Sequence, residues 1–350
     1  MSIGKGVFKT MAFDKMIVKK LLKKFDDVPF VVKFPDGEEF KVGEGEPQAI
    51  IRANGGIDMG AVMKSPSLAL GEAYMDKTLE LEKGDLFEIL NMVLAKLEDF
   101  ASDFSGLTKI MKTSTSKKNQ KQEIATHYDI GNEFFELWLD ETMSYSCGYF
   151  KHETDTLYDA QVHKVEHILK KLNLKEGQTL LDIGCGWGYL LIAAAKKYHV
   201  KGVGITLSEE QYKKGQERIK AEGLEGQVEI RLMDYRDLEK SGMTFDRIVS
   251  VGMLEHVSRD NYPLFFKNID KVLNKKGIVL LHYISGRQEH DGDPWIKKYI
   301  FPDVMVLSLW EMISCGSADG FYILDMENLR LHQILFTKGI NNDLSMTRWY

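Results

Sequence analysis

A glycine-rich loop follows a short apolar run near the middle of the chain. In Leu180–Gly188, with the sequence LLDIGCGWG, the apolar run leads into Asp182 and then into Gly184, Gly186 and Gly188. Glycines are needed where a backbone turns sharply and a ligand approaches it closely. A helix that begins behind such a loop attracts an anionic group to its N-terminus. The loop therefore predicts a ligand site, with a simple turn as the alternative.

The spacing of these glycines argues against a nicotinamide cofactor. A nicotinamide site would show GxGxxG with an acid about 20 residues further on. The chain has GxGxG instead, and the next predicted strand ends in Ile205 and Thr206 without an acid. A D-x-GxGxG loop after a first strand resembles that of class I S-adenosylmethionine (SAM)-dependent methyltransferases. The resemblance implies that the loop holds the methionine moiety of SAM, with Asp182 near its amino group.

Strands and helices alternate through the second half of the chain, which places the loop in a parallel sheet. Apolar runs that alternate with helices indicate βαβ units. The fold class predicted here is α/β: a doubly wound, mostly parallel Rossmann-like methyltransferase sheet with a smaller α+β N-terminal domain. The predicted strands are Thr179–Gly184, Lys201–Thr206, Val228–Leu232, Phe245–Val251 and Gly277–Ile284. The predicted helices include Tyr189–Tyr198 and Glu209–Glu222.

The N-terminal region is patterned differently. Residues 12–25 (AFDKMIVKKLLKKF) predict an amphipathic basic helix, which either docks its apolar stripe on the protein or lies on anionic lipid. Residues 29–45 predict a hairpin around a PDG turn, and helical patterns run from about Pro66 to Asp103.

The domain boundaries follow from a polar stretch. Thr113–Lys121 (TSTSKKNQK) is almost without apolar residues and is predicted to be a linker. We therefore expect an N-terminal lipid- or membrane-docking domain over residues 1–112, the linker over 113–121 and a methyltransferase domain over 122–350.

The composition excludes several classes of protein. Only three cysteines occur in 350 residues, without a CxxC pair, which indicates a reducing compartment and no metal site. No apolar run approaches the ~20 residues of a membrane-spanning helix, and lysines interrupt the N-terminal apolar positions, so no secretory signal is expected. A net charge of −6 argues against nucleic-acid binding. The sequence thus predicts a cytoplasmic protein and leaves contact with a membrane surface open.

Five further segments carry a more specific resemblance. They are HYDIGNEFF at 127–135, MSYSCGYF at 143–150, GITLSEEQ at 204–211, DRIVSVGMLEHV at 246–257 and LLHYISG at 280–286. Their order and their sequences resemble the motifs of the cyclopropane-fatty-acyl-phospholipid synthases and of the related mycolic acid cyclopropane synthases. The resemblance extends from roughly Gly71 to His332. The resemblance implies transfer of a methylene group from SAM to the cis double bond of an unsaturated phospholipid acyl chain. It also implies an enzyme peripherally associated with the inner face of the membrane, with a homodimer left open.

The resemblance implies which residues contact SAM. One group would surround the ribose and methionine, and another would hold the adenine. The full set is Tyr145, Ser146, Asp182, Gly184, Cys185, Gly186, Trp187, Gly188, Thr206, Leu207, Gln211, Tyr235 and Arg236.

Several of these residues have ordinary alternatives. Leu207 could belong to the core, its neighbour Ser208 could cap a helix, and Arg236 could be a solvated charge. Trp187 either packs in the interior or lines the site near the sulfonium, where an aromatic face attracts a cation.

Ring closure needs a base as well as a methyl donor. Methyl transfer to an alkene leaves a carbocation on the acyl chain, and water would quench it, so the cavity should be dry. The resemblance implies a bound bicarbonate ion as the base, at a site formed by Cys147, Glu255, His282 and the backbone of Ile284. His282 and the Cys147 thiol can donate hydrogen bonds to an anion, and Glu255 can accept one.

Each of these residues alone has another interpretation. A lone cysteine such as Cys147 is usually a small buried hydrophobe, and His282 could be structural. Glu255 and His256 could suggest a metal pair, but no third ligand stands at a recognisable spacing.

The end of the chain departs from the family pattern. After Glu327–His332 (ENLRLH), relatives continue with a tyrosine of the bicarbonate site, a tryptophan-containing helix and the last strand. Here Gln333–Tyr350 follows instead. We therefore expect an aberrant C-terminal end after residue 332, without that tyrosine, the last strand and part of the acyl-pocket wall. A frameshift, a truncation and a working variant are all compatible with this.

Two alternatives to an active synthase remain. One is a related SAM methyltransferase that acts on another acyl or amine acceptor. The other, from a different class, is a catalytically impaired protein that still binds SAM or membrane.

Overall fold

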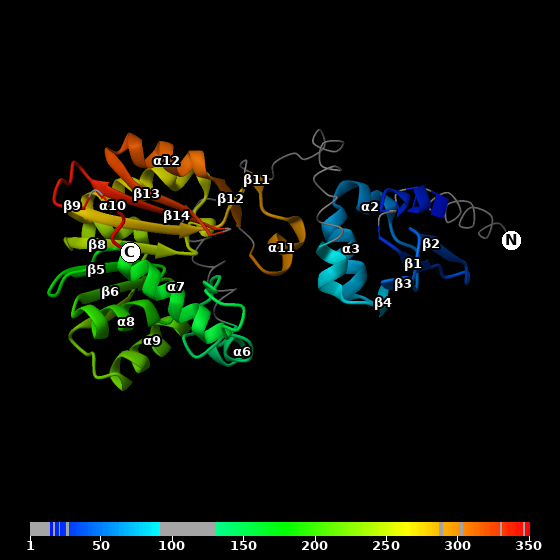
Figure 1. Ribbon diagram of the computed structural model, residues 1–350, viewed down its shortest axis with the longest axis horizontal. Coiled ribbons are helices and arrows are strands. Elements are labelled where there is room, and N and C mark those ends of the chain that lie inside the picture. The colour runs from blue at the N-terminus through cyan, green and yellow to red at the C-terminus, as the bar shows by residue number, and fades with distance from the viewer. Residues whose placement is uncertain are drawn as a thin grey trace. The chain divides into compact units, whose positions relative to one another are not determined.

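The computed structural model of the chain describes residues 15–16, 18–20, 22–25, 28–91, 130–286, 290–301, 304–329, 331–345 and 347–350 (Figure 1). The chain divides into two compact units, residues 1–111 with 293–298, and residues 112–292 with 299–350. Neither unit is therefore one continuous stretch of sequence. The predicted linker Thr113–Lys121 lies outside the described residues.

The N-terminal unit is built on a four-stranded sheet in the order β2-β1-β3-β4. Strands β1 (Phe30–Lys33) and β2 (Glu39–Val42) pair antiparallel, which confirms the predicted hairpin. Strand β3 (Ala49–Ala53) pairs parallel with β1. The chain then forms the helices α2 (Met59–Lys64) and α3 (Pro66–Met75) before it returns to the sheet.

One strand of this sheet stands where the sequence predicted helix. Helical patterns were predicted from about Pro66 to Asp103, and α3 agrees with the first part of that stretch. Strand β4 (Leu79–Lys83) pairs antiparallel with β3, so the prediction was wrong for these five residues. The segment LELEK alternates leucine with charge, which is a period of two and therefore suits a strand. Residues 92–103 of the predicted helical stretch lie outside the described residues.

The basic N-terminal segment contacts this sheet in its described residues. The Lys15 ammonium lies 2.5 Å from a carboxylate oxygen of Asp36 and 2.5 Å from one of Glu38, and Lys19 also pairs with Glu38. Leu22 and Phe25, the latter in the short helix η1 (Lys23–Phe25), pack against the sheet's apolar cluster. These contacts favour the docked alternative over the lipid-bound one.

The second unit contains a seven-stranded sheet in the order β13-β14-β9-β8-β5-β6-β7. Its neighbours pair in parallel except at β14, which is antiparallel to both β9 and β13. The predicted doubly wound, mostly parallel fold is therefore confirmed. The strands are β5 (Thr179–Ile183), β6 (Lys201–Thr206), β7 (Val228–Leu232), β8 (Phe245–Val251), β9 (Leu273–Tyr283), β13 (Phe321–Asn328) and β14 (His332–Lys338).

Helices cover both faces of this sheet (Figure 1). Helices α7 (Leu157–Lys171), α8 (Tyr189–Tyr198) and α9 (Glu209–Ala221) pack on one face, and α10 (Tyr262–Val272) and α12 (Leu309–Ala318) on the other. Because side chains alternate along a strand, Leu180 belongs to one apolar cluster and Leu181 to the other. Both faces are buried, which agrees with the apolar content of the strands on either side of each polar residue.

Short elements complete the second unit. A three-stranded sheet has the order β10-β12-β11. The remaining elements of this unit are α6 (Asn132–Glu136), η2 (Tyr235–Ser241), η3 (Leu254–His256), η4 (Arg259–Asn261), β10 (Ser285–Gly286), β11 (His290–Asp291) and β12 (Met305–Ser308). Helix α11 (Pro294–Tyr299) lies mostly within residues 293–298, which belong to the first unit. Among the described residues, no helix is long and apolar enough to span a membrane.

The expected loss of the last strand was wrong. Strand β14 begins at His332 and lies inside the sheet, between β9 and β13, with Ile334, Leu335 and Phe336 buried. Only three residues, 329–331, connect β13 to β14. The strand starts at the last residue of Glu327–His332, where the family pattern implied a tryptophan-containing helix before the last strand. The sheet edge that an absent strand would have left open is paired.

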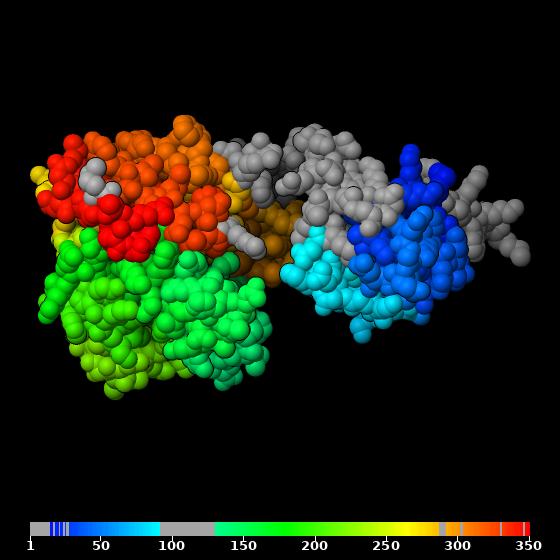
Figure 2. Space-filling model, in the orientation of Figure 1, coloured from blue at the N-terminus to red at the C-terminus, as the bar shows by residue number. Residues whose placement is uncertain are grey.

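The final residues lie on the surface of the same unit, where they appear red in Figure 2 beside the green segment that contains α7. Arg348 donates to Asp325 at 2.7 Å, and Trp349 Nε1 donates to the carbonyl of Lys170 at 3.2 Å. The Lys171 ammonium lies over the ring of Tyr350. The end of the chain is therefore attached to α7 and β13.

Candidate active site

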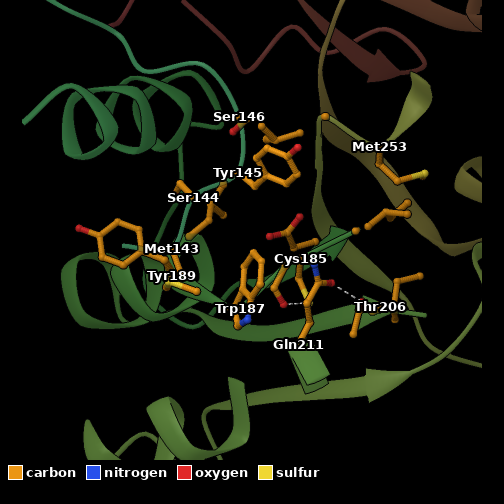
Figure 3. A pocket seen from close by; sticks show the side chains of 18 of the residues that line it. Met143, Ser144, Tyr145, Ser146, Cys185, Trp187, Tyr189, Thr206, Gln211 and Met253 are labelled. Carbon is orange, nitrogen blue, oxygen red and sulfur yellow. Dashed lines mark hydrogen bonds between the residues drawn. The ribbon is translucent and has the colours of Figure 1, made fainter. Parts of the chain in front are cut away.

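A pocket opens at the carboxyl ends of β5 and β6, the usual ligand position in a doubly wound sheet. Figure 3 shows Tyr145 and Ser146 on one side of it and Thr206 and Gln211 across from them. Most of the residues predicted to contact SAM line this pocket. They are Tyr145, Ser146, Asp182, Gly184, Cys185, Gly186, Trp187, Thr206, Leu207, Gln211 and Tyr235.

The glycine loop has the geometry that its sequence predicted. Gly184, Gly186 and Gly188 have φ angles of 81°, 54° and 83°, a region that side chains rarely adopt. A Cβ at Gly184 would lie 2.8 Å from Met253, and one at Gly188 would lie 2.8 Å from Ile230. A Cβ at Gly186 would meet no protein atom within 4 Å. Gly184 and Gly188 therefore allow neighbouring side chains to pack closely against the loop, and Gly186 leaves room for a ligand.

The segment after β6 is held by hydrogen bonds among its own side chains. Thr206 Oγ1 lies 2.7 Å from Gln211 Oε1 and donates to it, as the dashed line in Figure 3 marks. Ser208 caps α9 by accepting from the backbone N–H of Gln211, which confirms the capping interpretation of that serine. Both Thr206 and Gln211 are buried. The loop between them is thus held in one conformation beside the pocket.

The two residues predicted for the adenine have different positions. Tyr235 lines the pocket, and its hydroxyl is buried without a hydrogen-bond partner in the described structure. Burial raises the pKa of Tyr235 to about 12, so the hydroxyl keeps its proton and can donate. Arg236 does not line the pocket, and its guanidinium pairs with Asp234 at 2.5 Å. Gly188, the last glycine of the loop, does not line it either.

Trp187 belongs to a packed aromatic cluster as well as to the pocket wall. It is only 2% exposed, and its Nε1 donates to Asn132 Oδ1 at 2.6 Å. Its ring centroid lies 5.3 Å from that of Phe135. Tyr145 packs in the same cluster and stacks on Phe301 with a centroid distance of 6.0 Å. Packing therefore accounts for much of the environment of Trp187.

Three of the four residues predicted for the base site come together through strand pairing. Val251 of β8 pairs with His282 of β9, so Glu255, just after β8, faces the end of β9. Glu255 Oε1 accepts from the backbone N–H of Ile284 at 2.6 Å. Glu255 Oε2 and His282 Nε2 are buried without a hydrogen-bond partner in the described structure. Buried polar atoms are nearly always paired, so each of these two atoms favours a polar group bound beside it.

The protonation states at this site follow from burial. Burial raises the pKa of Glu255 to about 7, so the carboxyl can hold or release a proton near neutral pH. Burial, together with the charges of Lys164, Lys171 and His167, lowers the pKa of His282 to about 3. The imidazole is therefore neutral and can donate from one nitrogen only.

Cys147 differs from its predicted neighbours. It is exposed, whereas Glu255 and His282 are buried, and it belongs to the loop between α6 and α7. The interpretation of this cysteine as a buried hydrophobe therefore does not hold. No cluster of three or more metal-ligating side chains occurs within the part of the chain that the structure describes.

Two residues of α7 that the sequence analysis missed reach this region. Lys164 lines the pocket and donates to Ser146 Oγ at 2.6 Å. Gln161 donates to the backbone carbonyls of Ser144 at 3.2 Å and Ser146 at 2.8 Å. Both are buried on the face of α7 that carries Ile168. A lysine and a glutamine three residues apart in an apolar stripe were the signal that could have identified them.

The family profile described as mycolic acid cyclopropane synthetase matches residues 115–341, well over half of the chain. That match includes strand β14. A separate profile, described as a domain of unknown function, matches residues 17–105.

Several proteins of known name are similar to the chain. A cyclopropane-fatty-acyl-phospholipid synthase of Escherichia coli is 40% identical over 312 residues, which cover 87% of this chain and 77% of that protein. A probable fatty acid methyltransferase of Pseudomonas putida is 38% identical over 313 residues, 87% of this chain and 78% of that protein. A solved cyclopropane synthase of Mycobacterium tuberculosis is 26% identical with a TM-score of 0.58, over 65% of this chain and 100% of that one.

One solved structure also holds ligands. It is a mycolic acid cyclopropane synthase in complex with SAH and CTAB, 34% identical with a TM-score of 0.54. The similarity covers 59% of this chain and 76% of that chain.

Proposed function

Because the chain belongs to the mycolic acid cyclopropane synthetase family, we propose that it is a cyclopropane-fatty-acyl-phospholipid synthase. As a SAM-dependent methyltransferase it would transfer a methylene group from SAM to the cis double bond of an unsaturated phospholipid acyl chain. The observation that carries ring closure is the pair of buried, unpartnered polar atoms, Glu255 Oε2 and His282 Nε2, beside the cofactor pocket. Methyl transfer to an alkene leaves a cation, and ring closure requires a base that is placed to remove a proton from the new methyl group.

The pocket residues suit SAM by their chemistry. SAM supplies an electrophilic methyl group on a sulfonium. The open space at Gly186 admits a ligand against the backbone, and Asp182 offers a carboxylate to its amino group. The aromatic cluster around Trp187 and Phe135 excludes water from this side of the pocket. An alkene is a weak nucleophile, so positioning in a dry site supplies much of the rate.

The polar atoms beside the pocket suit bicarbonate. Bound there, bicarbonate would supply a base that is weakly nucleophilic and so does not trap the cation. His282, neutral in this environment, donates from Nε2, and Glu255 accepts or donates according to its proton. The backbone N–H of Ile284 orients Glu255 through its other oxygen. Cys147 would have to turn inward to join them, because it is exposed.

We also propose that the substrate is taken from a membrane surface. Two segments in which basic residues mix with apolar or aromatic ones are candidate contacts: residues 12–25 and Trp295–Phe301 (WIKKYIF). Lys15 is paired within the protein, and the Trp295 ring packs so closely on Gly71 that a Cβ there would lie 2.4 Å away. Better candidates for the membrane contact are apolar side chains that are exposed to solvent. Phe134, Leu137 and Trp138, at and after α6, are 45%, 81% and 44% exposed.

This membrane contact has its own test. Because interfacial aromatic and aliphatic side chains bind bilayers by burying apolar area, Leu137→Glu should reduce sedimentation with liposomes. A homodimer, which the sequence left open, stays a hypothesis.

A second candidate function is methylation of an acyl chain without ring closure. The exposed position of Cys147 and the absence of the family's tyrosine after His332 favour it. One experiment on the lipid product separates the two functions. Purified protein, SAM and bicarbonate are incubated with liposomes of a cis-monounsaturated phospholipid, and the lipids are analysed by mass spectrometry with ring-specific fragmentation. A cyclopropane product supports the proposal. A methyl-branched alkene, formed when the cation loses a proton from a neighbouring chain carbon, supports the second candidate.

A further inference from the structure

Lys164 is a buried ammonium without a carboxylate partner in the described parts of the chain. It is 3% exposed. Its Nζ donates to Ser146 Oγ and to Gln161 Oε1, which are both neutral acceptors. Burial lowers the pKa of Lys164 to about 8, so the group still carries its charge at neutral pH. The groups Asp140 and Cys147 raise this pKa through their charges, but neither forms an ion pair with the ammonium. A buried charge without an ion pair is costly, which points to an anion that binds beside it.

Asp182 is the matching opposite charge. It is 3% exposed, and its carboxylate makes no hydrogen bond or ion pair with a described residue. Burial raises the pKa of Asp182 to about 7. Lys164 and Asp182 line the same pocket but do not pair with each other. The pocket therefore presents one buried cation and one buried anion, each free to bind a ligand group of the opposite sign.

We propose that Lys164 binds the carboxylate of the methionine moiety of SAM, while Asp182 binds its ammonium. The inference rests on the proposed function, because it takes SAM as the ligand. An amino acid carries both charges on one carbon, so a site with two separate opposite charges fits it. Two such groups would hold the moiety in one orientation and aim the sulfonium at the acceptor.

The position of Lys164 is built into α7. Gln161 lies one turn earlier on the same buried face, and its amide holds the backbone of Ser144 and Ser146. Ser146 Oγ accepts from Lys164 and can also donate its own proton to a carboxylate. The helix thus fixes the loop that carries Ser146 and the ammonium together. A carboxylate at this point would have two donors.

The base anion is the competing partner for this ammonium. Lys164 lowers the pKa of His282 through its charge, so the two lie in one electrostatic environment. However, Lys164 and Ser146 line the cofactor pocket, whereas Cys147, Glu255 and His282 do not. The pocket that contains Lys164 is the one that contains the glycine loop. This placement favours the carboxylate of SAM over bicarbonate.

The test compares two ligands on two proteins. Lys164→Gln keeps a donor for Ser146 but removes the charge. Calorimetry then measures the binding of SAM and of decarboxylated SAM, which lacks only the carboxylate. The wild type should prefer SAM by about 10- to 100-fold, because a hydrogen bond between charged groups has that effect on affinity. Lys164→Gln should lose this preference by binding SAM more weakly.

Lys171→Gln is the matched control. Lys171 is a second buried lysine of α7, but it pairs with Glu327 at 2.5 Å and does not line the pocket. Its replacement should lower the melting temperature and keep the preference for SAM. Lys164→Gln should melt no lower than the wild type without ligand, because it removes an unpaired buried charge.

Three outcomes would overturn the inference. Equal loss of affinity for both ligands in Lys164→Gln would make Lys164 structural. Unchanged binding of SAM with a raised bicarbonate requirement would assign Lys164 to the base anion. Failure of the wild type to bind SAM would overturn the proposed function itself, which is a distinguishable result.

Discussion

Gln333 of β14 lies directly opposite His282 of β9, and its side-chain Nε2 is 3.2 Å from Nδ1 of the imidazole. An amide nitrogen only donates, so Nδ1 accepts and the single proton of the neutral ring lies on Nε2. Nε2 is the buried atom that has no partner in the described structure. Gln333 therefore directs a hydrogen-bond donor toward the proposed anion site. It does so from Gln333–Tyr350, the segment that departs from the family pattern.

Removing this hydrogen bond should impair the chemistry and spare the cofactor. Gln333→Leu lets the imidazole proton move to either nitrogen, so turnover should fall about 10- to 100-fold. The affinity for SAM should stay within about threefold. Product formation from labelled SAM and calorimetry measure the two quantities separately.

Thr337→Val is the matched control for Gln333→Leu. Thr337 lies on the same face of β14, is equally buried, and its hydroxyl is without a partner in the described structure. Its replacement should leave turnover unchanged. If the two variants lost turnover equally, the loss would belong to strand packing and not to His282.

Glu255 should make stability depend on pH. Burial raises its pKa from 4.5 to about 7. Between those values the folded protein holds a proton that the unfolded chain has released, so the free energy of unfolding falls as pH rises through this window. Glu255→Gln cannot ionise. Its free energy of unfolding relative to the wild type should therefore rise by up to about 3 kcal/mol from pH 5 to pH 8.

Urea unfolding of both proteins at several pH values, in buffer free of bicarbonate, measures this difference. The same variant should lose turnover about 100-fold or more while binding SAM normally. A stability difference that did not change with pH would show that Glu255 ionises as an exposed carboxyl does.

Gly186→Val should abolish SAM binding. Gly186 has a φ angle of 54°, and a side chain there would enter open space where the ligand is proposed to lie. Gly177→Val is the control, because Gly177 has a φ angle of 80° in an exposed turn before β5 and also faces open space. Both variants should lose stability through backbone strain. Only Gly186→Val should fail to bind SAM in calorimetry, and equal binding by both would place the ligand elsewhere.

The C-terminal strand should be essential for stability. Phe336 is fully buried between Phe266 and Phe321, with centroid distances of 5.8 Å and 6.2 Å. Phe336→Ala should lower the free energy of unfolding by about 3–5 kcal/mol. Ile340→Ala, at a side chain that is 67% exposed just beyond the strand, should change it by less than about 0.5 kcal/mol. Denaturant unfolding measures both changes. If Phe336→Ala changed the free energy of unfolding as little as Ile340→Ala does, this strand would not be part of the sheet in solution.

The central sheet could be predicted because its signals are local. Strands buried on both faces are rich in apolar residues, and the predicted bounds of Phe245–Val251 match the structure. Strand β14 carries an equally apolar run but was missed, because its place depends on pairing with β9, far away in the sequence. Strand β4 was missed for a different reason. Its alternation of leucine and charge is short and stands within a helical pattern.

The site was predictable to a similar degree. The glycine loop and the pairing of Glu255 with Ile284 follow from motifs at strand ends. The exposure of Cys147 and the burial of Lys164 do not, because each depends on how α7 packs against the sheet. Lysines are mostly exposed in proteins, so the sequence alone predicts a surface position for Lys164.

The most direct test of the central claim follows the methyl group itself. Liposomes of a cis-monounsaturated phospholipid are incubated with the protein, bicarbonate and SAM whose methyl group carries three deuterium atoms. Mass spectrometry then counts the deuterium atoms in the lipid product. Ring closure removes one hydrogen from the transferred methyl, so the account predicts a product that retains two of the three deuterium atoms. A product that retains all three, as a branched methyl group or a methylated amine would, contradicts it.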